Sequence, residues 1–324
     1  MDNSRRRFLK VAVAGTAAAT CVDAAHARPN LPMPPQALGL LFDGTLCVGC
    51  RACMTACKEV NNMPAEFTRL DTPSDTTEAL WDAPLDISGK TLNVIKAYRD
   101  GSGEEKDREK DGYAFTKLSC YHCADPSCVS ACPVSAMLKD PVTGIVSYDK
   151  DACIGCRYCV AACPFGVPRF TYDLTFPFVT KCELCRQRIP EGKYAACAEV
   201  CPTGATLYGP VAELKREVAR RRSLKPGTET AFPRGKIGSD DIHVAKVAKY
   251  VDHVYGEKEV GGTQVLHLSA VPFAKLGKPK LGEVSPASIS ETLSHTIYQG
   301  MIAPLLFLGG LIFAAKRSMK NEEK

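Results

Sequence analysis

The sequence has none of the residue constellations with which enzymes act directly on a substrate. No Ser/His/Asp set, glycine-rich phosphate-binding loop or pair of catalytic carboxylates stands out among the 324 residues. Organised positive charge is also scarce, since the formal net charge is +5 and no basic stripe interleaved with aromatic residues is present. These absences indicate that chemistry on a substrate takes place in other proteins, and that the partners are proteins and not nucleic acids.

Nearly all of the cysteines belong to four compact groups. Of the 17 cysteines, only Cys21 stands outside them. The groups are Cys47, Cys50, Cys53 and Cys57; Cys120, Cys123, Cys128 and Cys132; Cys153, Cys156, Cys159 and Cys163; and Cys182, Cys185, Cys197 and Cys201. The first and third follow the C-x2-C-x2-C-x3-C spacing of bacterial ferredoxins, in which the fourth cysteine binds the other cluster of a pair. At four thiolates per cluster, the sequence predicts four [4Fe–4S] clusters, a chain of redox centres.

Two other uses of paired cysteines compete with this interpretation. Paired C-x2-C motifs can hold structural zinc in closed four-cysteine sites. The ferredoxin spacing, however, crowds three thiolates against one metal and leaves a fourth over. An exported protein would normally form disulfides from an even number of cysteines. A structural zinc protein therefore stays as a remote alternative, and the disulfide alternative depends on the export route.

The N-terminus carries an export signal that bears on the disulfides. Residues 4–10 read Ser-Arg-Arg-Arg-Phe-Leu-Lys, a short apolar stretch follows, and Ala25-His26-Ala27 forms an A-x-A cleavage site. This combination predicts a twin-arginine signal peptide over residues 1–27. That route carries proteins already folded and loaded with cofactor, so the thiolates can be bound to iron before they reach an oxidising compartment. Cys21 lies inside the signal and leaves with it.

The C-terminus carries a second membrane feature. Residues 296–315, TIYQGMIAPLLFLGGLIFAA, contain no charged side chain. As a helix they would be about 30 Å long, the hydrocarbon thickness of a bilayer. We therefore predict one transmembrane helix, and residues 316–324 as a cytoplasmic tail, because Lys316, Arg317 and Lys320 follow the span. The cluster-bearing body then lies on the periplasmic face of the inner membrane.

Composition divides the chain between these ends into three parts. Residues 28–45 are rich in proline and predict an extended arm. Residues 46–208 hold all four cysteine groups and predict an α+β, ferredoxin-like domain with insertions. Its segments 47–57 and 153–163 share seven of eleven positions, which indicates a duplicated two-cluster unit. Residues 209–295 predict an extension made of a helix, a strand and a linker.

Several local elements can be placed within these parts. Segments 91–99 and 113–120 alternate and flank the charged loop 100–112, which predicts a hairpin. The segment 144–156 predicts a short strand that leads into Cys153. In the extension, a helix is expected over 210–222 and a strand within 261–271.

A few charged or polar residues stand close to the clusters or at helix ends. Arg51 and Arg157 lie inside cluster loops, where they either favour the reduced state by their charge or face solvent. His122 can donate a hydrogen bond to sulfur, but we expect it to face solvent. The run Arg220–Arg222 predicts a solvated helix end.

The order and spacing of the cysteine groups resemble a known family. With C-x2-C-x4-C-x3-C second and C-x2-C-x11-C-x3-C fourth, residues 40–210 resemble the four-cluster iron–sulfur subunits of the dimethyl-sulfoxide-reductase type. As a whole, the chain is similar to the ferredoxin-type subunits of hydrogenase-2, a membrane-bound nickel–iron uptake hydrogenase. The segments that carry this similarity are GTLCVGC, DPVTGIVSYDKDACIGCRYC, KCELC, LKPG and YGEKEVGGTQVL.

The resemblance implies an electron-transfer subunit that is not itself an enzyme. It would relay electrons between the small and large subunits of a hydrogenase and an integral membrane subunit that reacts with quinone, and it would not bind quinone alone. The alternative is the β subunit of a formate dehydrogenase or of another respiratory molybdoenzyme or reductase. Formate dehydrogenase β subunits have the C-terminal helix but no signal of their own, whereas this chain has both features.

The resemblance also implies how the groups share ligands. Each site takes three cysteines from one group and the last cysteine from another. The implied sets are Cys47, Cys50, Cys53 and Cys201 (site 1); Cys120, Cys123, Cys128 and Cys163 (site 2); Cys153, Cys156, Cys159 and Cys132 (site 3); and Cys182, Cys185, Cys197 and Cys57 (site 4). Sites 1 and 4 form one pair, and sites 2 and 3 form the other.

Overall fold

The computed structural model describes residues 27–64, 66, 86–298, 301, 308, 309 and 312. The chain divides into two units, one of residues Asn30–Ser285 and one of Met1–Pro29 with Pro286–Lys324. The larger unit crosses the boundary predicted at residue 208, because strands from both sides of that boundary share one sheet. The predicted signal peptide, apart from Ala27, and the predicted cytoplasmic tail lie outside the described residues.

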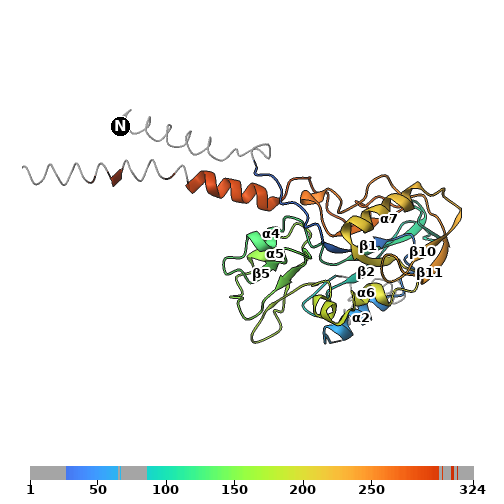
Figure 1. The fold of residues 1–324 in the computed structure, drawn as a ribbon, viewed down its shortest axis with the longest axis horizontal. Coiled ribbons are helices and arrows are strands. Elements are labelled where there is room, and N and C mark those ends of the chain that lie inside the picture. The colour runs from blue at the N-terminus through green and yellow to red at the C-terminus, as the bar shows by residue number, and fades with distance from the viewer. Residues whose placement is uncertain are drawn as a thin grey trace, which may run out of the picture. The chain divides into compact units, whose positions relative to one another are not determined.

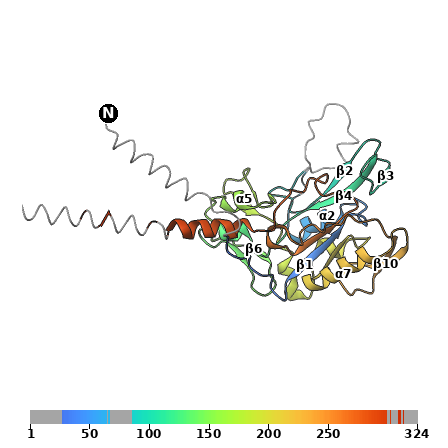
Figure 2. The ribbon, with the colours of Figure 1, turned by 90° about the horizontal axis from the view of Figure 1, so that it is seen from above.

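A three-stranded sheet forms the centre of the larger unit (Figure 1). Strand β1 (Leu38–Asp43) lies in the middle, parallel to β12 (Val265–Leu268) and antiparallel to β9 (Thr206–Pro210). Helix α7 (Val211–Ser223) packs along β1. Figures 1 and 2 show α7 on one side of β1 and the hairpin of β2 and β4 on the other. The sheet therefore joins the first described segment of the chain to its last strand.

Strand β1 differs from the extended arm predicted for residues 28–45. Leu41 is fully buried and pairs with Leu266 on one side and Leu207 on the other. The proline-rich part of the segment ends at Pro35, and the apolar run LGLLFD follows it. The side chains of this run are apolar on both faces of the strand, and both faces must be shielded from water. The run therefore enters the core as a central strand.

The predicted hairpin is confirmed. Strand β2 (Val94–Arg99) pairs antiparallel with β4 (Gly112–Leu118), and the charged loop between them adds the short strand β3 (Glu105–Lys106) parallel to β4. The helix expected over 210–222 is α7, and the strand expected within 261–271 is β12. These segments carry clear periodicity, so local sequence was sufficient to find them.

Three further hairpins surround the sheet. They are β5 (Met137–Lys139) with β6 (Val146–Tyr148), β7 (Arg169–Phe170) with β8 (Val179–Thr180), and β10 (Glu229–Pro233) with β11 (Ile242–Lys246). Strand β6 is the short strand predicted ahead of Cys153. The hairpin of β10 and β11 was not predicted, because its prolines and glycines hid the alternation of its side chains.

Short helices carry the cysteines. Helices α2 (Ala52–Val60) and α5 (Tyr158–Ala162) follow the loops of the first and third groups, and α4 (Ser127–Ser130) and α6 (Ala196–Glu199) lie in the second and fourth. Two 3-10 helices are also present, η2 (Arg186–Glu191) and η3 (Glu259–Gly261). Helix α2 contacts α6, and α4 contacts α5. The first group therefore lies beside the fourth, and the second beside the third.

The smaller unit contains a described helix over residues 286–298. The Arg28 guanidinium binds the Glu291 carboxylate at 2.5 Å, and the Arg28 backbone N–H donates to the Thr292 hydroxyl at 2.8 Å. Within the described ranges, no helix is both long and apolar enough to cross a bilayer. The span predicted over residues 296–315 falls mostly outside those ranges.

Candidate iron–sulfur sites

The cysteines of the first and fourth groups line two cavities in the core. One cavity is lined by Cys47, Cys50, Cys53 and Cys201. The other is lined by Cys57, Cys182, Cys185 and Cys197. In each cavity, three thiols come from one group and the fourth comes from the last cysteine of the other group. These combinations are the ones that the resemblance implied for sites 1 and 4.

The second and third groups exchange their last cysteines in the same way. Burial, followed by the charges of Cys120, Cys163 and Cys128, raises the pKa of the Cys123 thiol well above its usual value. Cys163 of the third group therefore lies among the thiols of the second. These four cysteines are the combination implied for site 2.

Site 3 follows the same arrangement. Burial, followed by the charges of Cys132 and Cys153, raises the pKa of the Cys159 thiol to about 11, and Cys156 adds to the effect. Cys132 of the second group thus lies among the thiols of the third. The contact between α4 and α5 brings the second and third groups together.

The loops of the first and third groups repeat one backbone conformation. Gly49 and Gly155 both have φ of 70°, and Arg51 and Arg157 follow with φ of 62° and 63°. Each arginine precedes the first residue of a short helix, α2 or α5. Left-handed residues next to right-handed ones turn successive N–H groups toward one point, which makes a concavity suited to an anion such as an iron–sulfur cluster. The residues that the two loops share therefore give both loops the same anion-binding concavity.

Burial of the thiols fits a positively charged metal partner. Burial raises the pKa of the Cys47 thiol and of the Cys53 thiol to about 12 in each case. A buried thiolate needs a compensating cation, and iron supplies it by binding the sulfur directly. Among the described residues, no three His, Cys, Asp and Glu side chains are grouped closely enough to hold a single metal ion. A four-iron cluster takes one thiolate at each iron and needs its cysteines spaced more widely, so the four sets described above are candidate donors for [4Fe–4S] clusters.

His122 is buried, so the expectation that it faces solvent is wrong. Its side chain has no exposed surface. Its Nδ1 accepts a hydrogen bond from the backbone N–H of Val146 at 3.0 Å, while its Nε2 has no partner in the described part of the chain. Since Nδ1 is an acceptor, the neutral ring carries its proton on Nε2. His122 stands between Cys120 and Cys123 in the sequence, so a sulfur of a cluster at site 2 is a candidate acceptor for this buried N–H.

The two arginines of the cluster loops have different surroundings. Arg51 lines the cavity of site 1. Arg157 lies over the rings of Phe170 and Tyr172, with its guanidinium carbon 5.6 Å and 5.8 Å from the ring centroids. An arginine held by two aromatic faces has a defined position next to the third group. Whether either charge tunes a cluster stays a prediction.

Two buried lysines and one half-buried lysine lie beside the cysteine groups, and the sequence reasoning missed them. The ammonium groups of Lys139 and Lys181 donate to the carbonyl oxygens of Cys123 at 2.8 Å and of Cys182 at 3.0 Å. Lys117, on β4, lines the cavity of site 4. The available signal was a lysine within an otherwise apolar strand, YAFTKLSC, or directly before a cysteine, as in KCELC.

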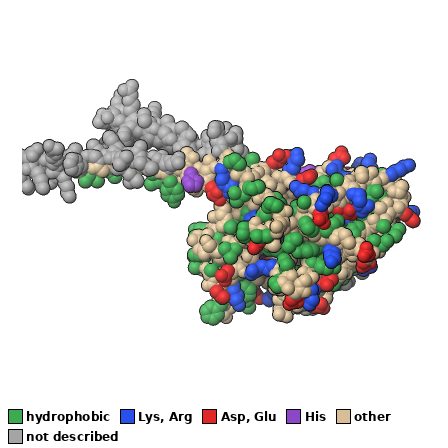
Figure 3. Space-filling view, viewed as in Figure 1, with side chains coloured by type: hydrophobic (Ala, Val, Ile, Leu, Met, Phe, Trp, Pro, Cys, Tyr) green, Lys and Arg blue, Asp and Glu red, His purple; other side chains and the backbone are tan. Residues whose placement is uncertain are grey.

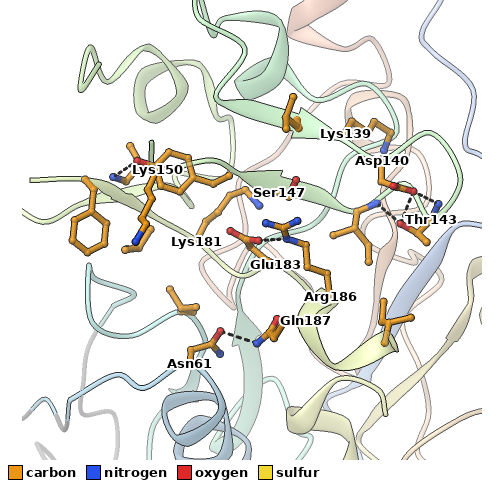
Figure 4. Close-up of a pocket in the computed structure, with 18 of the residues that line it drawn as sticks. Asn61, Lys139, Asp140, Thr143, Ser147, Lys150, Lys181, Glu183, Arg186 and Gln187 are labelled. Carbon is orange, nitrogen blue, oxygen red and sulfur yellow. Dashed lines mark hydrogen bonds and ion pairs between the residues drawn. The ribbon is translucent and has the colours of Figure 1, made fainter. Parts of the chain in front are cut away.

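A wide cavity opens between the two pairs of cysteine groups. Its volume is about 1080 Å³, and none of the described residues that line it is a cysteine. Figure 4 shows Lys139, Lys181 and Arg186 among its side chains, with Arg186 paired to Glu183. The two lysines lie between this cavity and the cysteines, so the cavity adjoins the sites without being one of them.

The run Arg220–Arg222 is not simply a solvated helix end, because Arg221 is fully buried. Its guanidinium binds the Asp43 carboxylate at 2.9 Å and the Glu217 carboxylate at 2.8 Å. Asp43 ends β1, four residues before Cys47, and also accepts a hydrogen bond from the Tyr250 hydroxyl at 2.8 Å. The interaction fixes α7 to the strand that leads into the first cluster loop.

Large apolar side chains are exposed around the third cysteine group. Ile154 is 66% exposed, Tyr158 61%, Tyr172 69% and Phe176 87%. Figure 3 shows hydrophobic side chains spread between charged ones over the visible face of the protein. Exposed apolar residues beside a redox site are typical of a surface that meets another protein.

Comparison with known proteins agrees with this geometry. Residues 112–210 match the family model of the 4Fe-4S dicluster domain. The chain is 46% identical over 326 aligned positions to the hydrogenase-2 operon protein HybA of Escherichia coli O157:H7, covering 98% of this chain and 97% of the relative. It is 31% identical over 282 positions to the iron–sulfur subunit of the nitrate-inducible formate dehydrogenase of Escherichia coli K12, covering 84% and 82%. The formate dehydrogenase iron–sulfur subunit of Haemophilus influenzae is 30% identical over 89% of this chain.

The cysteine sites and the dicluster match define a ferredoxin-type [4Fe–4S] protein of the electron-transfer class. The full-length similarity then narrows the class. The chain belongs to the HybA family of iron–sulfur electron-transfer subunits, which are not themselves catalytic.

Proposed function

We propose that this chain carries four [4Fe–4S] clusters and relays electrons between a nickel–iron hydrogenase and a membrane subunit that reduces quinone. The observation that carries this proposal is the 46% identity to HybA over nearly the whole of both chains. H2 oxidation in the catalytic heterodimer releases two protons and two electrons, and quinone reduction consumes two of each. Each cluster would accept and pass on one electron at a time.

The ligand sets of the four clusters are part of the proposal. We assign Cys47, Cys50, Cys53 and Cys201 to site 1, Cys120, Cys123, Cys128 and Cys163 to site 2, Cys153, Cys156, Cys159 and Cys132 to site 3, and Cys182, Cys185, Cys197 and Cys57 to site 4. The two cavities support sites 1 and 4. The interactions of Cys123 and Cys159 support sites 2 and 3.

Electrostatic interactions between cysteines of neighbouring sites support a linear path. Burial and then the charges of Cys57 and Cys120 raise the pKa of the Cys182 thiol, so site 4 adjoins site 2. Burial is the main cause of the raised pKa of the Cys53 thiol, and the charge of Cys197 is a lesser one. Cys53 of site 1 therefore lies near Cys197 of site 4. Cys159 likewise influences Cys128, so site 2 adjoins site 3. The proposed order is site 1, site 4, site 2 and site 3.

Both ends of this path reach the surface. At site 1, Cys50 is exposed and Val48 is 55% exposed. At site 3, Ile154 and Tyr158 are more than half exposed. A partner at either end can therefore approach the terminal thiols closely, which is what electron transfer between subunits needs.

Co-purification tests the choice of partner. The tagged chain, isolated from membranes, is expected to bring down a hydrogenase and to support H2-dependent dye reduction. If formate drives the reaction and H2 does not, the chain is instead a formate dehydrogenase subunit, an alternative that the 31% identity to such a subunit favours. Dithionite-reduced protein that lacks reduced-cluster EPR signals and contains zinc would remove both assignments.

We further propose export by the twin-arginine route and a single membrane span over residues 296–315, with the body in the periplasm. The support is the signal at residues 4–10 and the uncharged stretch before Lys316. Replacing Arg5 and Arg6 by lysine is expected to leave the precursor in the cytoplasm. A chain that ends at His295 is expected to appear in the soluble periplasmic fraction; continued membrane association without the partner subunits would contradict the span.

A further inference from the structure

Lys117 is a buried cation for which the described part of the chain offers no carboxylate. Lys117 is 1% exposed, and none of the ion pairs found among the described residues involves it. Its ammonium contacts the Thr206 hydroxyl at 3.4 Å. Transfer of an ammonium group from water into a protein core costs several kcal/mol unless another charge compensates it. The compensating charge has to come from groups around it.

The groups around Lys117 are the thiols of two sites. Lys117 lines the cavity of site 4 together with Cys57, Cys182, Cys185 and Cys197. Thr206, its hydrogen-bond partner, lines the cavity of site 1. The ammonium therefore lies between the two cavities.

The two thiols that interact most strongly with the ammonium come from different sites: Cys197 belongs to site 4 and Cys53 belongs to site 1. Lys117 thus faces one cysteine of each site. Thiolates bound to iron at these sites would compensate its buried positive charge.

The position of Lys117 has a consequence for reduction of the clusters. A cubane bound by four thiolates carries net negative charge, and reduction adds one more negative charge. A fixed cation in a low-dielectric core favours the more negative state. Salt screens this effect little, because the ammonium and the sites are buried together.

We propose that Lys117 is the shared counter-cation of the clusters at sites 1 and 4, raising the reduction potential of both and keeping them matched for electron transfer. In this role Lys117 acts through its positive charge and is not a ligand of either cluster. The inference rests on the proposed function, since it assumes that the thiols of sites 1 and 4 hold clusters. It goes beyond that function by naming the residue that sets two of the four potentials.

The test compares charge-removing and charge-keeping variants of the full-length protein by redox titration followed by EPR. In Lys117→Met, the ratio of reduced to oxidised cluster at a fixed potential is expected to fall about tenfold for two of the four one-electron steps. A tenfold change corresponds to ~59 mV for a one-electron couple. Lys117→Arg keeps the charge and is expected to titrate close to the wild type.

Two further variants serve as controls. Lys139 lies beside Cys123 of site 2, so Lys139→Met is expected to shift a different step and to leave the two Lys117-sensitive steps unchanged. Lys96 lies on the adjacent strand β2, opposite Thr116, and lines neither the site 1 nor the site 4 cavity. Lys96→Met is expected to leave all four steps in place.

Separate outcomes test the inference and the function on which it rests. A wild-type protein without iron or EPR signals would end the proposed function. Four intact clusters with unchanged potentials in Lys117→Met would overturn the proposed role of Lys117 as counter-cation and would leave the proposed function unaffected. If Lys117→Met loses iron, the decision falls to Lys117→Arg: normal loading and potentials support the role of charge, and equal loss of iron overturns it.

Discussion

The backbone N–H of Val146 donates a hydrogen bond to Nδ1 of His122 at 3.0 Å, and this contact fixes the protonation of the imidazole. Burial lowers the pKa of His122 well below its usual value, and Lys181 and Lys139 add to the effect, so the ring is neutral. Its proton then resides on Nε2, which has no partner in the described part of the chain. The contact with β6 thereby leaves a buried hydrogen-bond donor on a residue that stands between Cys120 and Cys123 in the sequence.

The first prediction follows from this donor. In His122→Asn, the amide oxygen can replace Nδ1 as acceptor, but the donor at the Nε2 position is lost. Because a hydrogen bond to sulfur stabilises the reduced cluster, the site 2 potential is expected to fall by about 40 mV, from a hydrogen bond of roughly 1 kcal/mol. In His122→Gln, which keeps an N–H near the Nε2 position, the redox titration is expected to shift less. Equal shifts in both variants would contradict a role for the Nε2 donor.

The second prediction concerns the buried ion pair between α7 and β1. Arg221→Met leaves the carboxylates of Asp43 and Glu217 without their cation in the core. Loss of one partner of a buried pair is expected to lower the free energy of unfolding by about 3 kcal/mol. Urea denaturation of the cluster-loaded protein measures it. Arg222→Met, at a more exposed position on the same helix, is the control and is expected to change little.

The third prediction is a pH dependence of the same pair. Burial favours a raised pKa for Glu217, but hydrogen bonds from Arg220 and the charge of Arg221 outweigh it and hold the pKa below its usual value of 4.5. A carboxyl with a lowered folded-state pKa contributes stability that is complete above pH 4.5 and is lost as the pH falls through the folded-state value.

Glu217→Gln removes this titration and keeps the shape of the side chain. The difference in urea midpoint between wild type and Glu217→Gln is expected to be largest at neutral pH and to shrink as the pH falls below 4.5. A difference that stays constant from neutral pH to below 4 would exclude Glu217 as the responsible group.

The fourth prediction uses two glycines that share one conformation. Gly49 and Gly155 both have φ of 70°, so alanine costs each loop about 1 kcal/mol of backbone strain. A Cβ at residue 49 would also lie 2.5 Å from the Phe115 ring, whereas at residue 155 the nearest atom belongs to the Phe170 ring at 3.7 Å. Gly49→Ala is therefore expected to lower the iron content and Gly155→Ala to retain it. Phe115→Leu in the Gly49→Ala background is expected to restore part of the iron.

Local pattern was sufficient for some of the fold and failed elsewhere for a physical reason. Helix α7 and the hairpin of β2 and β4 were found because their periodicity is visible within about ten residues. Strand β1 was missed because its neighbours, β9 and β12, lie more than 160 residues away along the chain. The residues close to this apolar run in the sequence do not show which two strands will pair with it.

The same division applies to the sites. Spacing alone predicted that the cysteines serve [4Fe–4S] clusters, because three thiolates in one short loop reach one cluster by local geometry. The burial of His122 and Arg221 contradicted expectations based on residue type, and the buried position of Lys117 had no prediction at all. A polar side chain is buried in a core only when another group compensates for its lost contact with water. That group can lie far away in the sequence, so the neighbouring residues do not reveal it.

The sequence by itself determined the cofactor class, the number of cysteine groups and the family, since ligand spacing and motif order are properties of short segments. The tertiary structure decided which groups lie together, through the contacts of α2 with α6 and of α4 with α5. It also decided which charges are enclosed with the thiols. Both depend on packing between segments far apart in the chain, where burial turns an ordinary lysine or histidine into a group that acts on its neighbours.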